Sequence, residues 1–256
     1  MRGLARIVTI TATLISVAGM AWAAEVRVLA VRAPEVALRN LAADFAKDSG
    51  HEVVFTIGSP AVVMQKIKAN EVYDAVIVSE PAMDQLDREG IVNPESRVRL
   101  AKTGIGVVVR DGATVPDVAT PEAFKQALMA AKSIVYGDVF PNQSGEKVEK
   151  ILAALGILDP LRPKIRIVSG HRNSQPLIAK GEVEMGLYNL SEIHEGTGIK
   201  LAGPVPPPLQ LTTTLEGALM SDGSVPEAAR AFVRFLASAD ARDKWTAAKL
   251  EPLGEH

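Results

Sequence analysis

The chain has 256 residues, of which 47% are hydrophobic and 23% charged, and it contains no cysteine. This length and composition exclude a disordered or fibrous protein and allow one large domain or two smaller ones, each with a substantial core. Lys and Arg number 28 against 30 Asp and Glu, so the net charge of −2 offers no basic excess for a nucleic-acid partner. The absence of cysteine excludes disulfides, thiolate metal sites and thiol nucleophiles.

The first 23 residues have the pattern of an export signal. Arg2 and Arg6 form a short positive segment, an uncharged apolar stretch follows, and Ala21-Trp22-Ala23 supplies the small residues of a cleavage site. The alternative is a single membrane anchor, for which the uncharged stretch is slightly short. We therefore expect cleavage near Ala23. Because there is no cysteine for a disulfide or a lipid anchor, we also expect a soluble protein of a Gram-negative periplasm.

Strands alternate with helices in the first part of the mature chain. Apolar runs and helical spacing predict, in order, a strand at 26–31, a helix at 34–49, a strand at 52–57, a helix at 60–69, a strand at 75–79 and a helix at 82–89. This alternation is typical of a mostly parallel sheet flanked by helices. A longer extended run, 100–110, follows and ends at the turn signal Asp111-Gly112.

The alternation restarts after this run. It predicts a helix at 121–131, a strand at 133–136, a helix at 145–155, a strand at 164–168, a helix at 174–180 and a strand at 184–188. The Pro-rich segment 204–208 then indicates a linker, and an extended run at 211–220 precedes helices at 226–238 and 240–249.

Two such clusters predict two α/β lobes between which the chain crosses twice. We expect residues 24–104 and 207–256 in one lobe and residues 105–206 in the other. Ligands of such sheets bind at the carboxyl ends of the strands, which places the expected ligand site in the cleft between the lobes.

Four segments occur in an order that is characteristic of one family. They are residues 26–67, YDAVIVSEPAMDQL (73–86), GDVFPNQSGEKVEKILAALG (137–156) and GEVEMGLYNLSEI (181–193), which together span almost the whole mature chain. This arrangement resembles the ModA-like, molybdate-binding family of ABC importers. The resemblance implies a two-lobed periplasmic binding protein fold of type II.

The sequence departs from that family where the resemblance places the ligand. The family holds its oxyanion with hydroxyls and with backbone N–H groups at helix N-termini. Ala33 stands where a serine is usual, and Ser59-Pro60 replaces a pair of serines, so that Pro60 offers neither hydroxyl nor N–H. Asn189 stands where the family has a tyrosine, with Tyr188 one position earlier. We therefore do not expect molybdate to be the ligand.

Positively charged residues occur near the same positions. Arg32 ends the first strand, and His171 and Arg172 lie together in the loop predicted to face it. Arginine binds a carboxylate through two N–H groups and keeps its charge, so an organic di- or tricarboxylate is the expected ligand. The candidate ligand-binding residues are Arg32, Ala33, Ser59, Ser144, His171, Arg172, Tyr188 and Asn189.

Each candidate also has a purely structural interpretation. Arg32 could pair with Glu35 on the protein surface, Ser59 could serve only as a helix cap, and Tyr188 could belong to the core. The four histidines lack the spacing of a metal site, and no phosphate-binding, dinucleotide-binding or nucleophile-elbow motif is present. We therefore expect no metal and no other cofactor.

Two functions remain open on the sequence alone. The first is a monomeric periplasmic receptor that closes over a small organic anion and delivers it to an ABC permease. The second is an isomerase with the same fold, similar to the aconitate isomerases, which would move a proton between the two ends of an allylic system. In that case His171 is the candidate base, because an unperturbed imidazole has a pKa of about 6.5.

Overall fold

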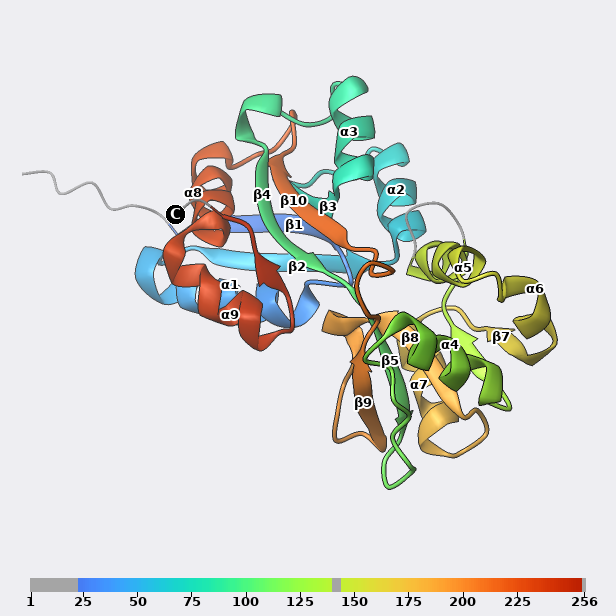
Figure 1. Ribbon diagram of the computed structural model, residues 1–256. Helices are drawn as coiled ribbons and strands as arrows, with labels where there is room; N and C mark the ends of the chain where they lie inside the picture. Colours follow the sequence, from blue (N-terminus) through green and yellow to red (C-terminus); the bar gives the residue numbers. More distant parts are fainter. Residues whose placement is uncertain (1–22, 140–143, 255–256) are drawn as a thin grey trace, which may run out of the picture.

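The computed structural model describes residues 23–139 and 144–254 (Figure 1). The predicted export signal lies outside these residues except for Ala23. The chain forms two lobes, each built on one β-sheet flanked by helices, which confirms the predicted fold class. In the described ranges we find no helix with the length and apolar character needed to cross a membrane.

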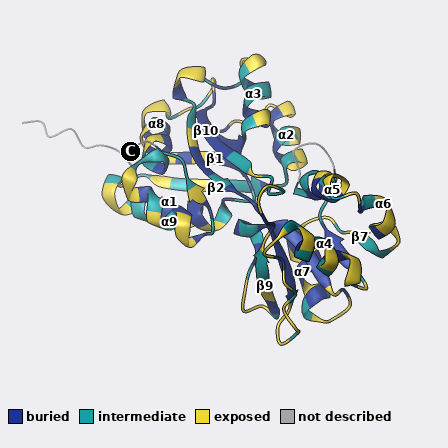
Figure 2. Cartoon of the chain, in the orientation of Figure 1, coloured by how far each residue is buried: buried dark blue, intermediate teal, exposed yellow. Residues whose placement is uncertain are grey.

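The first lobe contains a six-stranded sheet. In spatial order its strands are β11 (Glu251–Pro252), β4 (Val98–Thr103), β10 (Thr213–Leu219), β3 (Ala75–Ser79), β1 (Glu25–Val31) and β2 (Glu52–Gly58). Its helices are α1 (Glu35–Ser49), α2 (Pro60–Lys68), α3 (Glu80–Arg88), α8 (Pro226–Ala237) and α9 (Arg242–Ala247). Helices α1, α8 and α9 pack together on one face, and α2 and α3 cover the other (Figure 1). The central strands β1, β3 and β10 are among the most deeply buried elements, whereas the edge strand β2 is partly exposed, as Figure 2 shows.

The second lobe contains a five-stranded sheet. In spatial order its strands are β7 (Ile165–Ile167), β6 (Ile134–Tyr136), β8 (Met185–Asn189), β5 (Ile105–Arg110) and β9 (Ile199–Pro204). Its helices are α4 (Pro121–Ala130), α5 (Ser144–Ala154), α6 (Leu158–Leu161) and α7 (His171–Ala179), and the short 3₁₀ helix η3 (Leu190–Glu192) follows β8. Separate apolar clusters, one around Phe124 and Ile151 and one around Ile178 and Tyr188, form its core.

Both sheets are mixed, although the sequence predicted mostly parallel ones. Strand β1 pairs in parallel with β2 and β3, but β10 is antiparallel to β3 and β4. In the second sheet β6 is parallel to β7 and β8, but β5 is antiparallel to β8 and β9. The antiparallel strands come from the segments that carry the chain between the lobes. The sequence predicts no helix there of the kind that connects two parallel strands, so it gave no indication of their direction.

The extended run 100–110 is two strands in two sheets. The chain passes from β4 to β5 at Gly104, where an added Cβ would lie 2.7 Å from the Gln210 side chain. Gln210, on the returning segment, accepts a hydrogen bond from the Ile105 backbone N–H (2.7 Å) and donates one to its carbonyl (2.9 Å). The two segments by which the chain passes between the lobes are therefore hydrogen-bonded to each other. The lobe boundaries at 104/105 and 206/207 stay a prediction.

Two further differences concern the second lobe. Strand β9 covers residues for which we predicted no strand, directly before the Pro-rich segment. Helix α7 begins at His171 rather than at Ser174, so His171 and Arg172 belong to its first turn and not to a loop.

Candidate functional site

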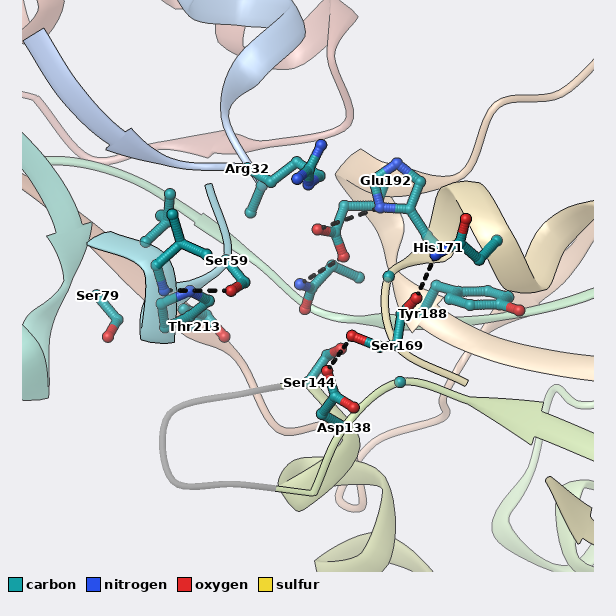
Figure 3. A pocket seen from close by; sticks show the side chains of 18 of the residues that line it. Arg32, Ser59, Ser79, Asp138, Ser144, Ser169, His171, Tyr188, Glu192 and Thr213 are labelled. Atoms are coloured by element: carbon teal, nitrogen blue, oxygen red, sulfur yellow. Dashed lines mark hydrogen bonds and ion pairs between the residues drawn. The ribbon is translucent and has the colours of Figure 1, made fainter. Parts of the chain in front are cut away.

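A cavity of about 320 Å³ lies between the two lobes (Figure 3). This volume is in the range of small-molecule sites. The first lobe contributes Val31, Arg32, Ala33, Ser59, Pro60, Val62, Ser79, Thr213 and Leu215. The second lobe contributes Gly137, Asp138, Ser144, Ser169, Gly170, His171, Asn173, Tyr188, Asn189 and Glu192. Seven of the eight predicted ligand-binding residues therefore come together at one cavity, and Arg172 does not.

The N-termini of four helices meet at this cavity. Ser59 precedes α2 and Ser79 precedes α3, while α5 begins at Ser144 and α7 begins at His171. The Ser59 hydroxyl accepts a hydrogen bond from the Val62 N–H (3.4 Å), so its capping role is realised in the structure. Helix N-termini carry partial positive charge and unpaired N–H groups, which favour an anion. The sequence predicted two of these serines and missed Ser79, although it follows a strand as Ser59 does.

Close packing fixes the position of the α5 N-terminus. An added Cβ on Gly145 would come within 2.3 Å of the carbonyl oxygens of Gly137 and Asp138. The Asp138 carboxylate in turn accepts a hydrogen bond from the Ser169 hydroxyl (2.8 Å), which joins the loops after β6 and β7. Only glycine allows this approach, so the residue after Ser144 is part of the site architecture.

Arg32 is the cationic side chain of the first lobe at the cavity. It follows β1 and is half-buried, and its guanidinium has no hydrogen-bond or ion-pair partner among the residues that the structure describes. The alternative pairing with Glu35 is not formed, because Glu35 bonds to Arg39 (3.0 Å) and to Arg172 (2.9 Å). Arg32 is therefore available to an anion in the cavity.

Arg172 lies outside the cavity because its guanidinium binds Glu35 across the gap between the lobes. Burial opposes the ionisation of Glu35, but the hydrogen bond from Arg39 and the charges of Arg172 and Arg32 hold the pKa of its carboxyl below its usual value. The first turn of α7 splits the two predicted residues: His171 is buried at the cavity and Arg172 is exposed.

A carboxylate that the sequence analysis did not select, Glu192, lies beside His171. Its Oε1 is 3.5 Å from His171 Nδ1, and its Oε2 accepts a hydrogen bond from Asn189 Nδ2 (2.9 Å). The His171 ring packs against His194, with ring centroids 5.3 Å apart. Burial and the charges of His171 and Arg172 lower the pKa of His194 below its usual value. Glu192 is the penultimate residue of the family-like segment 181–193, but no motif singled it out.

Tyr188 lines the cavity, but its ring runs from β8 away from Ser59 and Ser144 (Figure 3). Its side chain belongs to the apolar cluster of the second lobe, and burial raises the pKa of its phenol. Asn189 is 8% exposed and directs its amide toward Glu192. Among the described residues, no group of three or more His, Asp or Glu side chains is arranged to hold a metal ion.

Comparisons with known proteins place these features in a family. Residues 26–248 match the family described as bacterial extracellular solute-binding protein. Over 196 residues the chain is 34% identical to an aconitate isomerase from Pseudomonas sp., covering 76% of this chain and 73% of that protein. It is 23% identical to the molybdate-binding protein ModA of Azotobacter vinelandii, covering 84% and 85%.

Solved structures share the fold at low identity. The periplasmic molybdate-binding protein of Azotobacter vinelandii matches with a TM-score of 0.74 at 22% identity, covering 90% of this chain and all of that one. The substrate-binding domain of a molybdenum ABC transporter from Clostridium difficile, itself described as putative, matches with a TM-score of 0.75 at 16% identity, with the same coverage. The chain therefore belongs to the bacterial extracellular solute-binding protein family and has the two-lobed fold of its ModA-type members.

Proposed function

We propose that this protein is a periplasmic isomerase that interconverts cis- and trans-aconitate. The observation that carries the proposal is the Glu192–His171 pair at the edge of an anion-binding cavity. A carboxylate in the cavity wall repels an anionic ligand, whereas proton transfer from carbon requires a base, a role that Glu can fill. The aconitate isomerase relative supports the same reaction, and the family and the predicted export signal support the location.

The cavity offers the contacts that a tricarboxylate requires. Arg32 can bind one carboxylate through two parallel N–H donors. The N-termini of α2, α3, α5 and α7 offer partial positive charge to the others. Ala33 and Pro60 also line the cavity and offer no hydroxyl, so recognition of the ligand would depend on Arg32 and the helix N-termini.

The reaction is a 1,3-proton shift. A base removes a proton from the methylene carbon of trans-aconitate, and the C–H electron pair spreads over the allylic system and the adjacent carboxylate. The protonated base then donates a proton to the carbon at the other end of the allylic system. The double bond moves in this way, and no oxidant or reductant is needed. Arg32 and the helix N-termini are positioned to stabilise the charge that develops on the carboxylates.

A test of this proposal begins with residues 24–256 and a panel of anions. Thermal shifts are measured with molybdate, sulfate, citrate, cis-aconitate and trans-aconitate, and proton NMR then follows trans-aconitate in D₂O. We expect stabilisation by the tricarboxylates and conversion with deuterium incorporation. Stabilisation by molybdate alone would contradict a carboxylate site altogether.

The second candidate is a carboxylate receptor that delivers its ligand to an ABC permease. It is favoured by membership of the solute-binding family and by the two-lobed fold around one cavity. Tight binding of citrate or an aconitate without isomerisation or deuterium incorporation would support this candidate and exclude the enzyme.

A further inference from the structure

We propose that Glu192, and not His171, is the catalytic residue that removes and returns the proton, and that His171 is a positioning residue acting through Glu192. The inference rests on the proposed isomerase function and goes further, because it assigns the proton transfer to the carboxylate of Glu192.

Accessibility separates the two side chains. The His171 side chain is 5% exposed and the Glu192 side chain 14%. His171 Nε2 is fully buried and has no hydrogen-bond partner in the described part of the chain. Its Nδ1 is directed at Glu192 Oε1. Neither imidazole nitrogen is therefore in a position to contact a carbon acid bound in the cavity.

Glu192 has the orientation that a base needs. Figure 3 shows its carboxylate on the side of the imidazole that faces Ser59 across the cavity. Each carboxylate oxygen has one protein neighbour, His171 for Oε1 and Asn189 for Oε2. Because an ionised carboxylate has about four lone-pair sites, both oxygens keep one with which to accept a proton from substrate.

The surrounding residues hold this carboxylate in place. The Asn189 amide donates to Oε2 at 2.9 Å, and the Gln175 amide donates to the Glu192 backbone carbonyl at 2.8 Å. Asn189, Gln175 and His171 are all nearly fully buried. Glu192 is therefore held by hydrogen bonds at its backbone carbonyl and at Oε2, and His171 Nδ1 lies 3.5 Å from Oε1. Rigid support of this kind keeps a base within reach of the reacting carbon.

The step balances without any further reactant. The C–H bond of the substrate methylene breaks as the O–H bond of Glu192 forms, and the electron pair enters the allylic system. The carboxyl proton can exchange with solvent at this stage, and the O–H bond then breaks as a C–H bond forms at the other terminal carbon, which restores the Glu192 carboxylate. His171 exchanges no proton with the substrate in either half of the reaction.

The test compares variants of the full mature chain by the rate of trans-aconitate isomerisation and by ligand-induced thermal shift. Glu192→Gln is expected to lose at least about one-hundred-fold in turnover and still to be stabilised by trans-aconitate. Glu192→Asp keeps a carboxylate one methylene further back and is expected to retain part of the activity. Glu182→Gln is the matched control, because Glu182 is exposed and remote from the cavity lining.

Two variants of His171 distinguish positioning from catalysis. His171→Asn retains a donor near the position of Nδ1, whereas His171→Ala does not. We expect Asn to retain more activity than Ala, with the loss in kcat rather than in KM. If the imidazole itself were the base, both would be equally inactive and Glu192→Gln would remain active, which would overturn the assignment.

Failure of the inference is distinguishable from failure of the function. A wild-type protein that isomerises trans-aconitate, with Glu192→Gln folded and equally active, contradicts the role of Glu192 alone. A wild-type protein that binds tricarboxylates but neither isomerises them nor exchanges their protons contradicts the proposed function and the inference together. Far-ultraviolet circular dichroism confirms that each variant is folded.

Discussion

Arg32 is the residue on which we expect anion recognition to depend most. Its guanidinium lines the cavity, and no residue in the described ranges pairs with it. Hydrogen bonds to charged groups contribute about 1.5–3 kcal/mol, so Arg32→Ala is expected to weaken tricarboxylate binding about ten- to one-hundred-fold. Isothermal titration calorimetry measures the change. Arg88→Ala, at the exposed end of α3, is the control, and equal affinities for both variants would exclude a ligand role for Arg32.

His194 makes the protein less stable in mild acid. Burial, His171 and Arg172 lower the pKa of its imidazole in the folded state, whereas the unfolded chain has a pKa of about 6.5. The unfolded state therefore binds protons first, and stability that is complete above pH 6.5 is lost as the pH falls toward the lower, folded-state pKa. His194→Gln is expected to flatten the decline in melting temperature between pH 7 and pH 5, and an unchanged decline would contradict this account.

The sequence identified the basic residues of the cavity, Arg32 and His171, but it did not identify the acidic residue Glu192. Arg32 and His171 were selected because they are cationic or ionisable side chains near the positions where the sequence departs from a known family, and the structure brings both to the cavity. Arg172 has the same side-chain chemistry as Arg32, but the helical twist of α7 turns it toward Glu35. Glu192 follows β8 by only three positions, and its contact with His171 joins two segments about twenty residues apart, which no spacing rule anticipates.

The N-termini of four helices lie at the cavity, and we expect them to contribute to anion recognition. Each of α2, α3, α5 and α7 follows a strand, so the order of elements in the sequence already directs their positive ends to the carboxyl edges of the sheets. The lengths of the loops do not reveal how close these ends come. That depends on contacts such as the one between Gly145 and the carbonyls of Gly137 and Asp138.

Gly145→Ala tests this element directly. The new methyl group would lie 2.3 Å from two carbonyl oxygens, so α5 must move away from the loop after β6. Overpacking of this kind costs about 1–3 kcal/mol, which corresponds to a melting temperature lower by about 2–12 °C, and ligand-induced stabilisation should fall as well. Gly137→Ala is the control, because its Cβ would meet only the Ser144 hydroxyl at 3.7 Å. Equal melting temperatures for the two variants would contradict the packing argument.

At the scale of the whole molecule, two ion pairs bridge the lobes. Arg172 of α7 binds Glu35 of α1 at 2.9 Å, and Lys249 of the first lobe binds Glu195 of the second at 2.6 Å. Exposed pairs contribute about 0.2–1 kcal/mol each. We expect them to favour the observed arrangement of the lobes over a more open one by at most about thirty-fold.

The double variant Glu35→Gln/Glu195→Gln is therefore expected to open the molecule. Small-angle X-ray scattering without ligand should give a larger radius of gyration, and tricarboxylate affinity should fall by no more than the same factor. The control is Glu71→Gln/Glu251→Gln, which removes two ion pairs that lie within the first lobe. An unchanged radius of gyration and affinity in the bridging variant would show that these pairs do not favour closure.

The overall architecture was more predictable than its details. Alternating strands and helices indicated two α/β lobes, because each amphipathic helix needs a sheet to cover. The antiparallel pairing of β10 and β5 was not predictable, since an extended run carries no information about the direction of its neighbours. The break at Gly104 was missed because β4 and β5 adjoin it in one extended run of the sequence and differ only in the sheet they join.

The central claim, that this cavity moves a proton on a tricarboxylate, is tested most directly by proton NMR of trans-aconitate in D₂O with the wild-type mature chain. The account predicts that the trans vinyl signal declines as the cis signal grows, with deuterium entering the methylene and vinyl positions. Glu192→Gln should bind the ligand and leave both signals unchanged. A wild-type sample in which bound trans-aconitate persists with all its carbon-bound protons would contradict the account.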